Sequence, residues 1–550
     1  MAEVAAAVGE RLGPNAELIT IPVIPQHPHL DDATVPVHVR APLLAGPVGA
    51  HFAVIDYNRD VDKPLPAARP RADGTFPDYD LEDPRFAQLN AYAIASRVTE
   101  LVDRELGRGL GWGFDGNRLM LLPHAGSMAN AFYSEETQSL QLFSFVDDNG
   151  ELYHTSLVHD IVAHETGHAV LDAVRDRYTE GNHPDTAAIH EAVGDLTAVL
   201  AALSHDVVRD ELLAQAPEDL HGANVVADIA EEFQAGIARG KLAPLRSLTT
   251  PGHPPDPNPR SEEPHDRSLQ LSRAVWDGLA RLYALNRSRG ESPVPALELA
   301  RTAVQRMVLR ALDYLPPADA TFEDFARAVL AADRVANDTD QFGFRPAMAD
   351  AFAAWGLAPP EALAGLGEPQ EPWPGLPAAW PRLSPTEAYL FLDAHRDRLA
   401  IAPDPEYRDF VLRSFQVTSR PPEHEEFDEV IFVYEYPIDV QLSDKQFPRS
   451  LAGQWLTLWG GGTLVFDSGR ALRFHAERPV TRDRVAAALA FLARSVGSNN
   501  VTLVEPTPDD EVRSAVATTS YLAEVGAEKV AFRSNPAARC GGRAGYGAAS

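Results

Sequence analysis

The segment His164-Glu165-Thr166-Gly167-His168 contains two histidines four positions apart, with a glutamate directly after the first histidine. Positions i and i+4 lie on one face of an α-helix, so both imidazoles can present a ring nitrogen to the same ion. Nitrogen ligands of this kind suit zinc. The glutamate can reach a water molecule on the metal without becoming a ligand, as in the H-E-x-x-H motif, where it is the general base. The spacing therefore predicts a helical site for one zinc ion.

A catalytic zinc ion usually has three protein ligands, so the third must come from another segment. An extended motif that ends in a third histidine is excluded, because Leu171 and Val174 occupy its glycine and histidine positions. A second acidic segment instead offers Glu191 and Asp195, one helical turn apart on one face. We expect Glu191 to bind the metal and Asp195 to accept a hydrogen bond from the far nitrogen of a ligand histidine. His190 is interpreted as structural, since its position points off the ligand face.

With these residues the chain resembles the thermolysin-like gluzincin metallopeptidases, over residues 85–357. Residues 164–170 are similar to the active-site helix of that family, and Asp172 fits the same pattern. Glu191 lies at a typical distance for the third-ligand helix. Asn130-Ala131-Phe132-Tyr133 resembles the edge strand that pairs with the substrate backbone. Residues 264–268 resemble the segment that carries the histidine of the oxyanion site.

The resemblance implies an endopeptidase that hydrolyses peptide bonds with a metal-activated water molecule. It also implies a role for each matched residue. His164, His168 and Glu191 would bind zinc, Glu165 would be the general base, His265 and Tyr178 would stabilise the oxyanion, Asp172 and Asp195 would support the ligands, and Asn130 and Ala131 would bind substrate.

The sequence departs from the family pattern near the oxyanion histidine. The family has an aspartate five residues before that histidine, where this chain has Arg260, so Glu262, Glu263 or Asp266 would have to substitute. The family's substrate-side arginine has no identifiable counterpart. Tyr178 is close to its expected position but slightly out of register. Arg260 therefore keeps a second hypothesis open, a non-catalytic zinc-binding protein whose C-terminal domain binds a partner. A hydrolase acting on a non-peptide amide is a third.

The chain as a whole predicts an α+β fold. Helical periodicity is clear over Phe86–Leu106 and Leu157–Arg177, and helices are expected from 185 to 355. The resemblance implies a two-lobed, thermolysin-like peptidase with a strand-containing N-lobe, a helical C-lobe and an additional C-terminal α/β domain. The predicted parts are an N-terminal β-rich segment (1–84), the N-lobe with the zinc helix (85–182), the helical C-lobe (183–358), a Pro-rich linker (359–385), a small α/β domain (386–535) and a flexible tail (536–550).

The composition limits the partners. The formal charge of −31 over 550 residues argues against nucleic acid and anionic membranes as partners, and the resemblance implies a peptide or protein substrate. The acidity favours Ca²⁺ as an additional ion, but no segment has the EF-hand pattern. Cys540 is the only cysteine, so no internal disulfide is expected. The sequence as written begins without a signal peptide, which predicts a cytoplasmic protein, and secretion would require an incomplete N-terminus.

Overall fold

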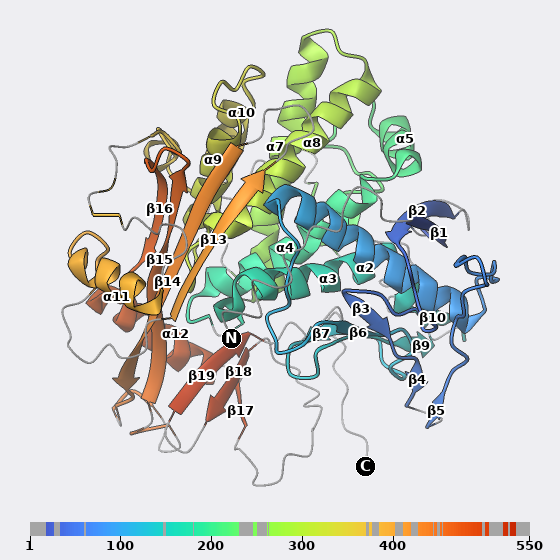
Figure 1. The fold of residues 1–550 in the computed structure, drawn as a ribbon, viewed down its shortest axis with the longest axis horizontal. Coiled ribbons are helices and arrows are strands. Elements are labelled where there is room, and N and C mark those ends of the chain that lie inside the picture. Colours follow the sequence, from blue (N-terminus) through green and yellow to red (C-terminus); the bar gives the residue numbers. More distant parts are fainter. Residues whose placement is uncertain are drawn as a thin grey trace.

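The computed structural model has a mixed α+β fold, in which helices occupy the centre and sheets lie on two sides of them (Figure 1). Arg260, Glu262 and the predicted tail 536–550 lie outside the residues that the structure describes. Those residues are 18–26, 34–59, 62–146, 150–179, 181–229, 246–249, 261, 263–369, 373, 375–376, 384–401, 411–419, 427–443, 445–447, 451–453, 455–497, 501–504, 521–525 and 529–534.

The N-terminal part contains a sheet whose described strands follow the order β3-β6-β8-β7. Strands β3 (Phe52–Val54), β6 (Leu119–Leu122) and β8 (Ser139–Leu142) are parallel, whereas β7 (Ala131–Ser134) runs antiparallel to β8 and is the last strand in this order. The segment that resembles a substrate-pairing edge strand therefore forms an end strand of this sheet. Short ribbons lie beside it, namely β1 (Leu18–Val23) with β2 (Val35–Arg40), β4 (Tyr57–Asn58) with β5 (Lys63–Pro64), and β9 (Ser144–Val146) with β10 (Leu152–His154).

The helix predicted at Phe86–Leu106 is confirmed as α2 (Pro84–Leu106). Its N-cap, Asp83, accepts a hydrogen bond from the Arg85 backbone N–H, and proline occupies the first turn, where no intrahelical donor is needed. Gly107 ends the helix with φ of 68°, a conformation that glycine adopts without steric cost. Helix α2 packs on α3 (His159–Val174), which contains the H-E-x-x-H segment.

Helices dominate the middle of the chain, as predicted. Helix α4 (Pro184–Ala202) packs against α3 on one side and α7 (Pro264–Ser288) on another. The other elements of this part are α5 (Asp206–Gln215), α8 (Pro293–Ala311), α9 (Phe322–Ala336), α10 (Phe344–Ala354), the short helices η1 (Thr155–Leu157), η2 (Asp176–Tyr178), η3 (Leu312–Tyr314) and η4 (Pro360–Leu363), and the strand pair β11 (Asp228–Ile229) and β12 (Arg246–Ser247). One continuous apolar core joins these helices to the N-terminal sheet.

Among the described residues, no single helix has the length and apolar composition needed to cross a membrane. Helices α4 and α5 satisfy that criterion only as a pair, bent by 98°, and every residue of α4 after Pro184 is buried within the protein.

The C-terminal part is built on a second sheet, seen beside the helices in Figure 1. Alternate side chains of its central strands point to opposite faces, so each face is covered separately. Ile431 and Val465 join the main core, while Phe432 and Phe466 pack with Phe391 and other apolar residues. The elements are α11 (Pro385–Ala394), β13 (Val411–Ser419), β14 (Phe427–Gln441), β15 (Trp455–Asp467), β16 (Leu472–Arg478), α12 (Arg482–Gly497), β17 (Val501–Val504), β18 (Tyr521–Val525) and β19 (Lys529–Ser534).

Buried polar contacts fasten this sheet to the helical part. The Arg310 guanidinium lies 2.6 Å from the Glu429 carboxylate, both groups are buried, and the Tyr314 hydroxyl also donates to Glu429. Arg177, just beyond α3, stacks 3.8 Å from the centroid of the Trp459 ring. Breaking the Arg310–Glu429 pair would leave an uncompensated buried charge. These contacts join the sheet to α8, η3 and η2.

A buried histidine beside α5 predicts a loss of stability in mild acid. His205 packs edge-on against His159 with ring centroids 5.5 Å apart, and burial, with His159, Arg97 and Arg209 nearby, lowers the pKa of His205 to about 3. In the unfolded chain a histidine has a pKa of about 6.5. As pH falls below that value, the unfolded state takes up the proton first, so folding stability is lost down to the folded pKa. Between pH 7 and pH 5 the titration of this residue should lower the free energy of unfolding by about 2 kcal/mol.

Urea unfolding at pH 7 and pH 5 measures this effect. The variant His205→Phe keeps an aromatic ring but cannot titrate, so its free energy of unfolding should fall by about 2 kcal/mol less than that of the wild type over this range. Equal pH dependence in the two proteins would show that His205 does not contribute.

Candidate metal centre

Two glycines let helices α3 and α4 approach closely enough to share a site. A Cβ atom on Gly167 would lie 2.1 Å from Thr197 Oγ1 and 3.0 Å from the Cα of Gly194. A Cβ atom on Gly194 would lie 2.6–2.8 Å from three atoms of the His164 ring. The imidazole of His164 therefore lies directly against the backbone of α4, where a larger residue would leave no room.

His164, His168 and Glu191 form a buried group whose potential ligand atoms all lie within 4.8 Å of one another. His164 Nε2 is 3.5 Å from Glu191 Oε2, and His168 Nε2 is 3.9 Å from Glu191 Oε1. Within the described part of the chain, His168 Nε2 is buried without a hydrogen bond, whereas Glu191 Oε2 has the ring nitrogens of His265 and His164 at 3.2 Å and 3.5 Å. Buried polar atoms normally have partners, because desolvation without compensation is costly. A cation between these atoms would supply that compensation, so the group could hold a metal ion.

The far side of His164 is supported by a carboxylate. Its Nδ1 lies 3.2 Å from Asp195 Oδ1, on the same helix as Glu191. Asp195 also accepts a hydrogen bond from the Ser272 hydroxyl at 3.1 Å. A carboxylate in this place fixes the ring orientation and leaves Nε2 as the nitrogen that faces Glu191.

The far side of His168 contacts a residue that sequence analysis misjudged. His190 Nδ1 lies 2.7 Å from His168 Nδ1, and the two rings stack with centroids 4.7 Å apart. Burial lowers the pKa of His190 to about 4. The interpretation that His190 points off the site is wrong, because α4 lies so close to α3 that the residue before Glu191 also faces the ligand helix. The sequence signal for this contact was the position of His190 directly before Glu191.

Glu165 is held by strand β7. Its carboxylate, 1% exposed, accepts a hydrogen bond from the Tyr133 backbone N–H at 3.0 Å. The Tyr133 hydroxyl donates to Asp172 at 2.6 Å, so one residue joins β7 to two points on α3. Asp172, expected beside the ligands, thus contacts the strand. Burial raises the pKa of Glu165 to about 7, the range in which a carboxylate can both accept and return a proton.

His265 lies in the first turn of α7 and reaches the metal-ligand group. Its Nε2 is 3.2 Å from Glu191 Oε2, and its Nδ1 contacts Glu263 Oε1 at 2.7 Å. Burial acts to lower the pKa of His265, but the charges of Glu191 and Glu263 outweigh it and raise that pKa. Of the three candidates for an orienting carboxylate, the structure brings Glu263 to His265. Asp266 instead accepts a hydrogen bond from Ser261.

Tyr178 does not fit the oxyanion role expected for it. Its side chain is fully buried in η2, and its hydroxyl donates to the backbone carbonyl of Pro316 at 2.8 Å. The hydroxyl is therefore engaged with the segment after η3.

Arg246, in strand β12, is a site residue that sequence analysis missed. Its guanidinium lies 2.9 Å from Asp195 Oδ1, 3.6 Å from Glu191 Oε2 and 3.3 Å from His164 Nδ1. It offsets the mutual repulsion of the buried carboxylates. Its position depends on the pairing of Arg246 with Ile229 in a two-residue ribbon, which has no recognisable sequence signal.

The two residues predicted to bind substrate lie at the start of β7. The Asn130 side-chain oxygen accepts a hydrogen bond from the Ala131 N–H at 2.9 Å. Ala131 is buried, and its partner across the sheet is Leu142 of β8. Asn130 therefore caps the first N–H of the strand in this structure.

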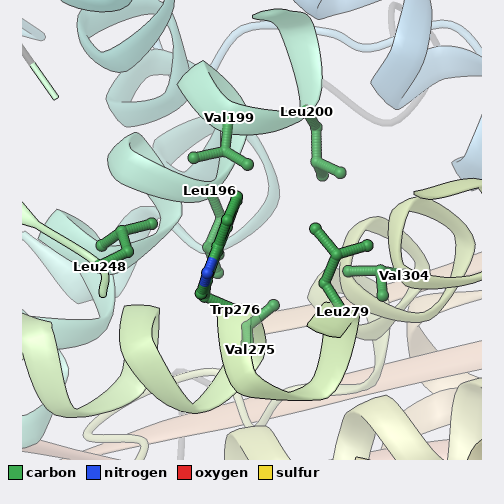
Figure 2. Close-up of a pocket in the computed structure, with 8 residues that line it drawn as sticks. All are labelled: Leu196, Val199, Leu200, Leu248, Val275, Trp276, Leu279 and Val304. Atoms are coloured by element: carbon green, nitrogen blue, oxygen red, sulfur yellow. The ribbon is translucent and has the colours of Figure 1, made fainter. Parts of the chain in front are cut away.

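A small apolar cavity of about 10 Å³ lies on a different face of α4 (Figure 2). Figure 2 shows Trp276 among the aliphatic side chains that line it, which come from α4, α7, α8 and the segment after β12. A cavity this small and apolar offers no metal ligand and no room for a substrate. The lining residues are Leu196, Val199, Leu200, Leu248, Val275, Trp276, Leu279 and Val304.

Comparison with known proteins gives no independent assignment, since no protein-family model and no curated protein matches this chain. The metal centre is therefore argued from the geometry of its own residues.

The close contact at Gly194 leads to a prediction about metal binding. In Gly194→Ala the added methyl group would occupy the place of the His164 ring, which would have to move. We expect the affinity for zinc to fall by about tenfold or more, the scale seen when the support of a ligand is disturbed. Competition with a chromophoric chelator measures this affinity. Gly278→Ala is a matched control on α7, where the added methyl group would meet the flexible Met348 side chain of α10. This variant should keep normal zinc affinity. Wild-type affinity in Gly194→Ala would contradict the described packing.

Proposed function

We propose that this protein is a zinc-dependent endopeptidase with a thermolysin-like arrangement of its site. The observation that carries the proposal is one juxtaposition. A buried His164-His168-Glu191 group lies beside Glu165, a carboxylate that the end strand β7 holds through a backbone N–H. The packing of α3 against α4 on one side and its contact with β7 support this proposal.

Zinc fits the donor set best. Two imidazole nitrogens and one carboxylate oxygen are the ligands of known catalytic zinc sites with an open position. When bound, zinc would lower the pKa of a coordinated water molecule to about 7 and polarise a carbonyl oxygen. The ligands would be His164 Nε2, His168 Nε2 and a carboxylate oxygen of Glu191.

Glu165 would move the proton. With a pKa of about 7 in the protein as described, its carboxylate can accept a proton from the attacking water and return it to the leaving amine. A bound cation would lower this pKa by favouring the charged form, which suits the accepting step. The Tyr133 N–H holds one carboxylate oxygen and so fixes the direction of the other.

His265 would stabilise negative charge on the substrate carbonyl. Glu263 fixes its Nδ1 and favours the protonated ring, so Nε2–H can donate to an oxyanion. Arg246 forms an ion pair with Asp195 and adds a positive charge beside the ligand group. In this proposal the His265 Nε2–H would be the donor to the developing charge, without the Tyr178 hydroxyl.

The substrate would be a peptide or a protein. Strand β7 ends its sheet, so an extended peptide could pair with it by strand addition near Asn130 and Ala131, provided that the Asn130 side chain releases the Ala131 N–H. The strongly acidic composition disfavours nucleic acid as a partner.

A zinc protein without catalytic activity is the second candidate. It is favoured by the burial of the three ligands, of which none is more than 3% exposed. In that case the C-terminal sheet would carry the function by binding a partner, and the metal would stabilise the fold.

A cleavage assay on a mixed peptide library distinguishes the two candidates. The full chain, loaded with zinc, is incubated with the library, and the products are identified by mass spectrometry. An endopeptidase cuts within the peptides, loses activity when a chelator removes the metal, and regains it with added zinc. Tightly held zinc without any cleavage would support the non-catalytic candidate and reject the first.

A further inference from the structure

The two histidines of the candidate metal centre have different partners on their far sides. His164 Nδ1 faces the carboxylate of Asp195 at 3.2 Å, and Arg246 neutralises that carboxylate at 2.9 Å. His168 Nδ1 faces the imidazole of His190 at 2.7 Å. Both rings turn Nε2 toward Glu191, so in each case the partner at Nδ1 decides which nitrogen is free to bind a cation.

A contact of 2.7 Å between two imidazole nitrogens needs one proton between them. If His190 donated that proton, the neutral His168 ring would carry its own proton on Nε2, which would block the ligand atom. If His168 donates from Nδ1, its Nε2 lone pair points to the group that includes Glu191. Only this second arrangement permits metal binding, and it requires His190 to accept at Nδ1 and carry its proton on Nε2.

The surroundings of His190 suit this arrangement. The ring is 1% exposed, so water does not compete for its Nδ1, although an Nε2–H would be buried with no acceptor among the described residues, which is a cost of this tautomer. It sits directly before Glu191 on α4, so one helical segment supplies both a ligand and the support of another ligand. The stacked rings, with centroids 4.7 Å apart, restrict rotation of His168.

We infer that His190 is a positioning residue, which selects the metal-binding tautomer of His168 by accepting a hydrogen bond from its Nδ1. This inference rests on the proposed zinc site and adds to it. The support is an imidazole, unlike the carboxylate behind His164. The protein thus keeps a single buried carboxylate behind its two ligand histidines and balances that charge with Arg246.

Two polar variants of similar size test the position of the acceptor. In His190→Asn the side-chain oxygen can occupy the place of Nδ1, whereas in His190→Gln the terminal amide reaches the place of Nε2. We expect the zinc affinity to fall by about 10–100-fold in His190→Gln and by less than about tenfold in His190→Asn. Affinity is measured by competition with a chromophoric chelator. The absorption spectrum of the Co²⁺-loaded proteins reports whether the ligand geometry changes.

His205→Phe provides the control, since His205 is also buried but contacts His159 instead of a ligand. It should keep the zinc affinity and the Co²⁺ spectrum of the wild type. Wild-type affinity and an unchanged spectrum in His190→Gln would overturn the inference, and so would equal losses in the Gln and Asn variants. A wild-type protein that binds no zinc would instead reject the proposed function, so the two failures are distinguishable.

Discussion

Glu165→Gln is expected to lower the rate of peptide cleavage by a factor of about 10²–10⁴ while zinc stays bound. The amide has nearly the shape of the carboxylate, and its oxygen can still accept the hydrogen bond from the Tyr133 N–H. The glutamine amide cannot take a proton from water at neutral pH. Because Glu165 is not among the three grouped ligands, the affinity for zinc should change little. The measurements are kcat/KM on a cleaved peptide and the zinc content of the purified variant.

A surface variant provides the control for this substitution. Glu100→Gln changes the same chemical group at a side chain that is 51% exposed and pairs with Arg97, so activity should be that of the wild type. If Glu165→Gln kept its zinc and full peptidase activity, Glu165 would not be the base.

Glu191→Ala should abolish cleavage through loss of the metal. Glu191 is the anionic member of the ligand group, and its carboxylate also faces the positive charges of His265 and Arg246. Structural zinc sites have binding free energies of about 10–16 kcal/mol spread over their ligands, so one ligand corresponds to roughly a hundredfold or more in affinity. Chelator competition measures this loss directly.

The comparison with Glu263→Gln separates metal binding from support of the oxyanion site. Glu263 contacts His265 but lies outside the ligand group, so its variant should keep zinc and lose only part of its activity. Glu191→Ala with wild-type zinc affinity would mean that the ion, if bound, uses other ligands.

The local part of the site could be predicted because its signals are periodic. His164 and His168 are four positions apart, as are Glu191 and Asp195. Helix geometry alone places each pair on one face. The structure brings these four residues together between α3 and α4. The two glycines that permit this contact, Gly167 and Gly194, have no periodicity and become meaningful only when both helices are placed.

The residues that were missed depend on contacts between distant segments. Arg246, the missed residue, is placed by a two-residue strand pair. Glu263 was one of the three carboxylates named from the sequence, and its position as the N-cap of α7, in contact with His265, distinguishes it. Tyr178 shows the opposite failure, since its hydroxyl donates to the Pro316 carbonyl instead of facing the ligand group.

The C-terminal sheet shows a similar limit at the level of the fold. The sequence predicts a small α/β domain in this part of the chain, and β14 and β15 are found there. Periodicity cannot say which core a strand joins. The buried contact of Glu429 with Arg310 and Tyr314 ties this sheet to the helices, and it links residues more than a hundred positions apart.

The central claim, that this chain cuts peptides with one zinc ion held by His164, His168 and Glu191, is tested most directly by a zinc titration of the metal-free protein. Peptide cleavage is followed as zinc is added to a known concentration of the full chain. The proposed function predicts no cleavage at the start and a linear rise that reaches its plateau at one zinc ion per chain. Cleavage that is independent of added zinc, or no cleavage after one ion has bound, would contradict it.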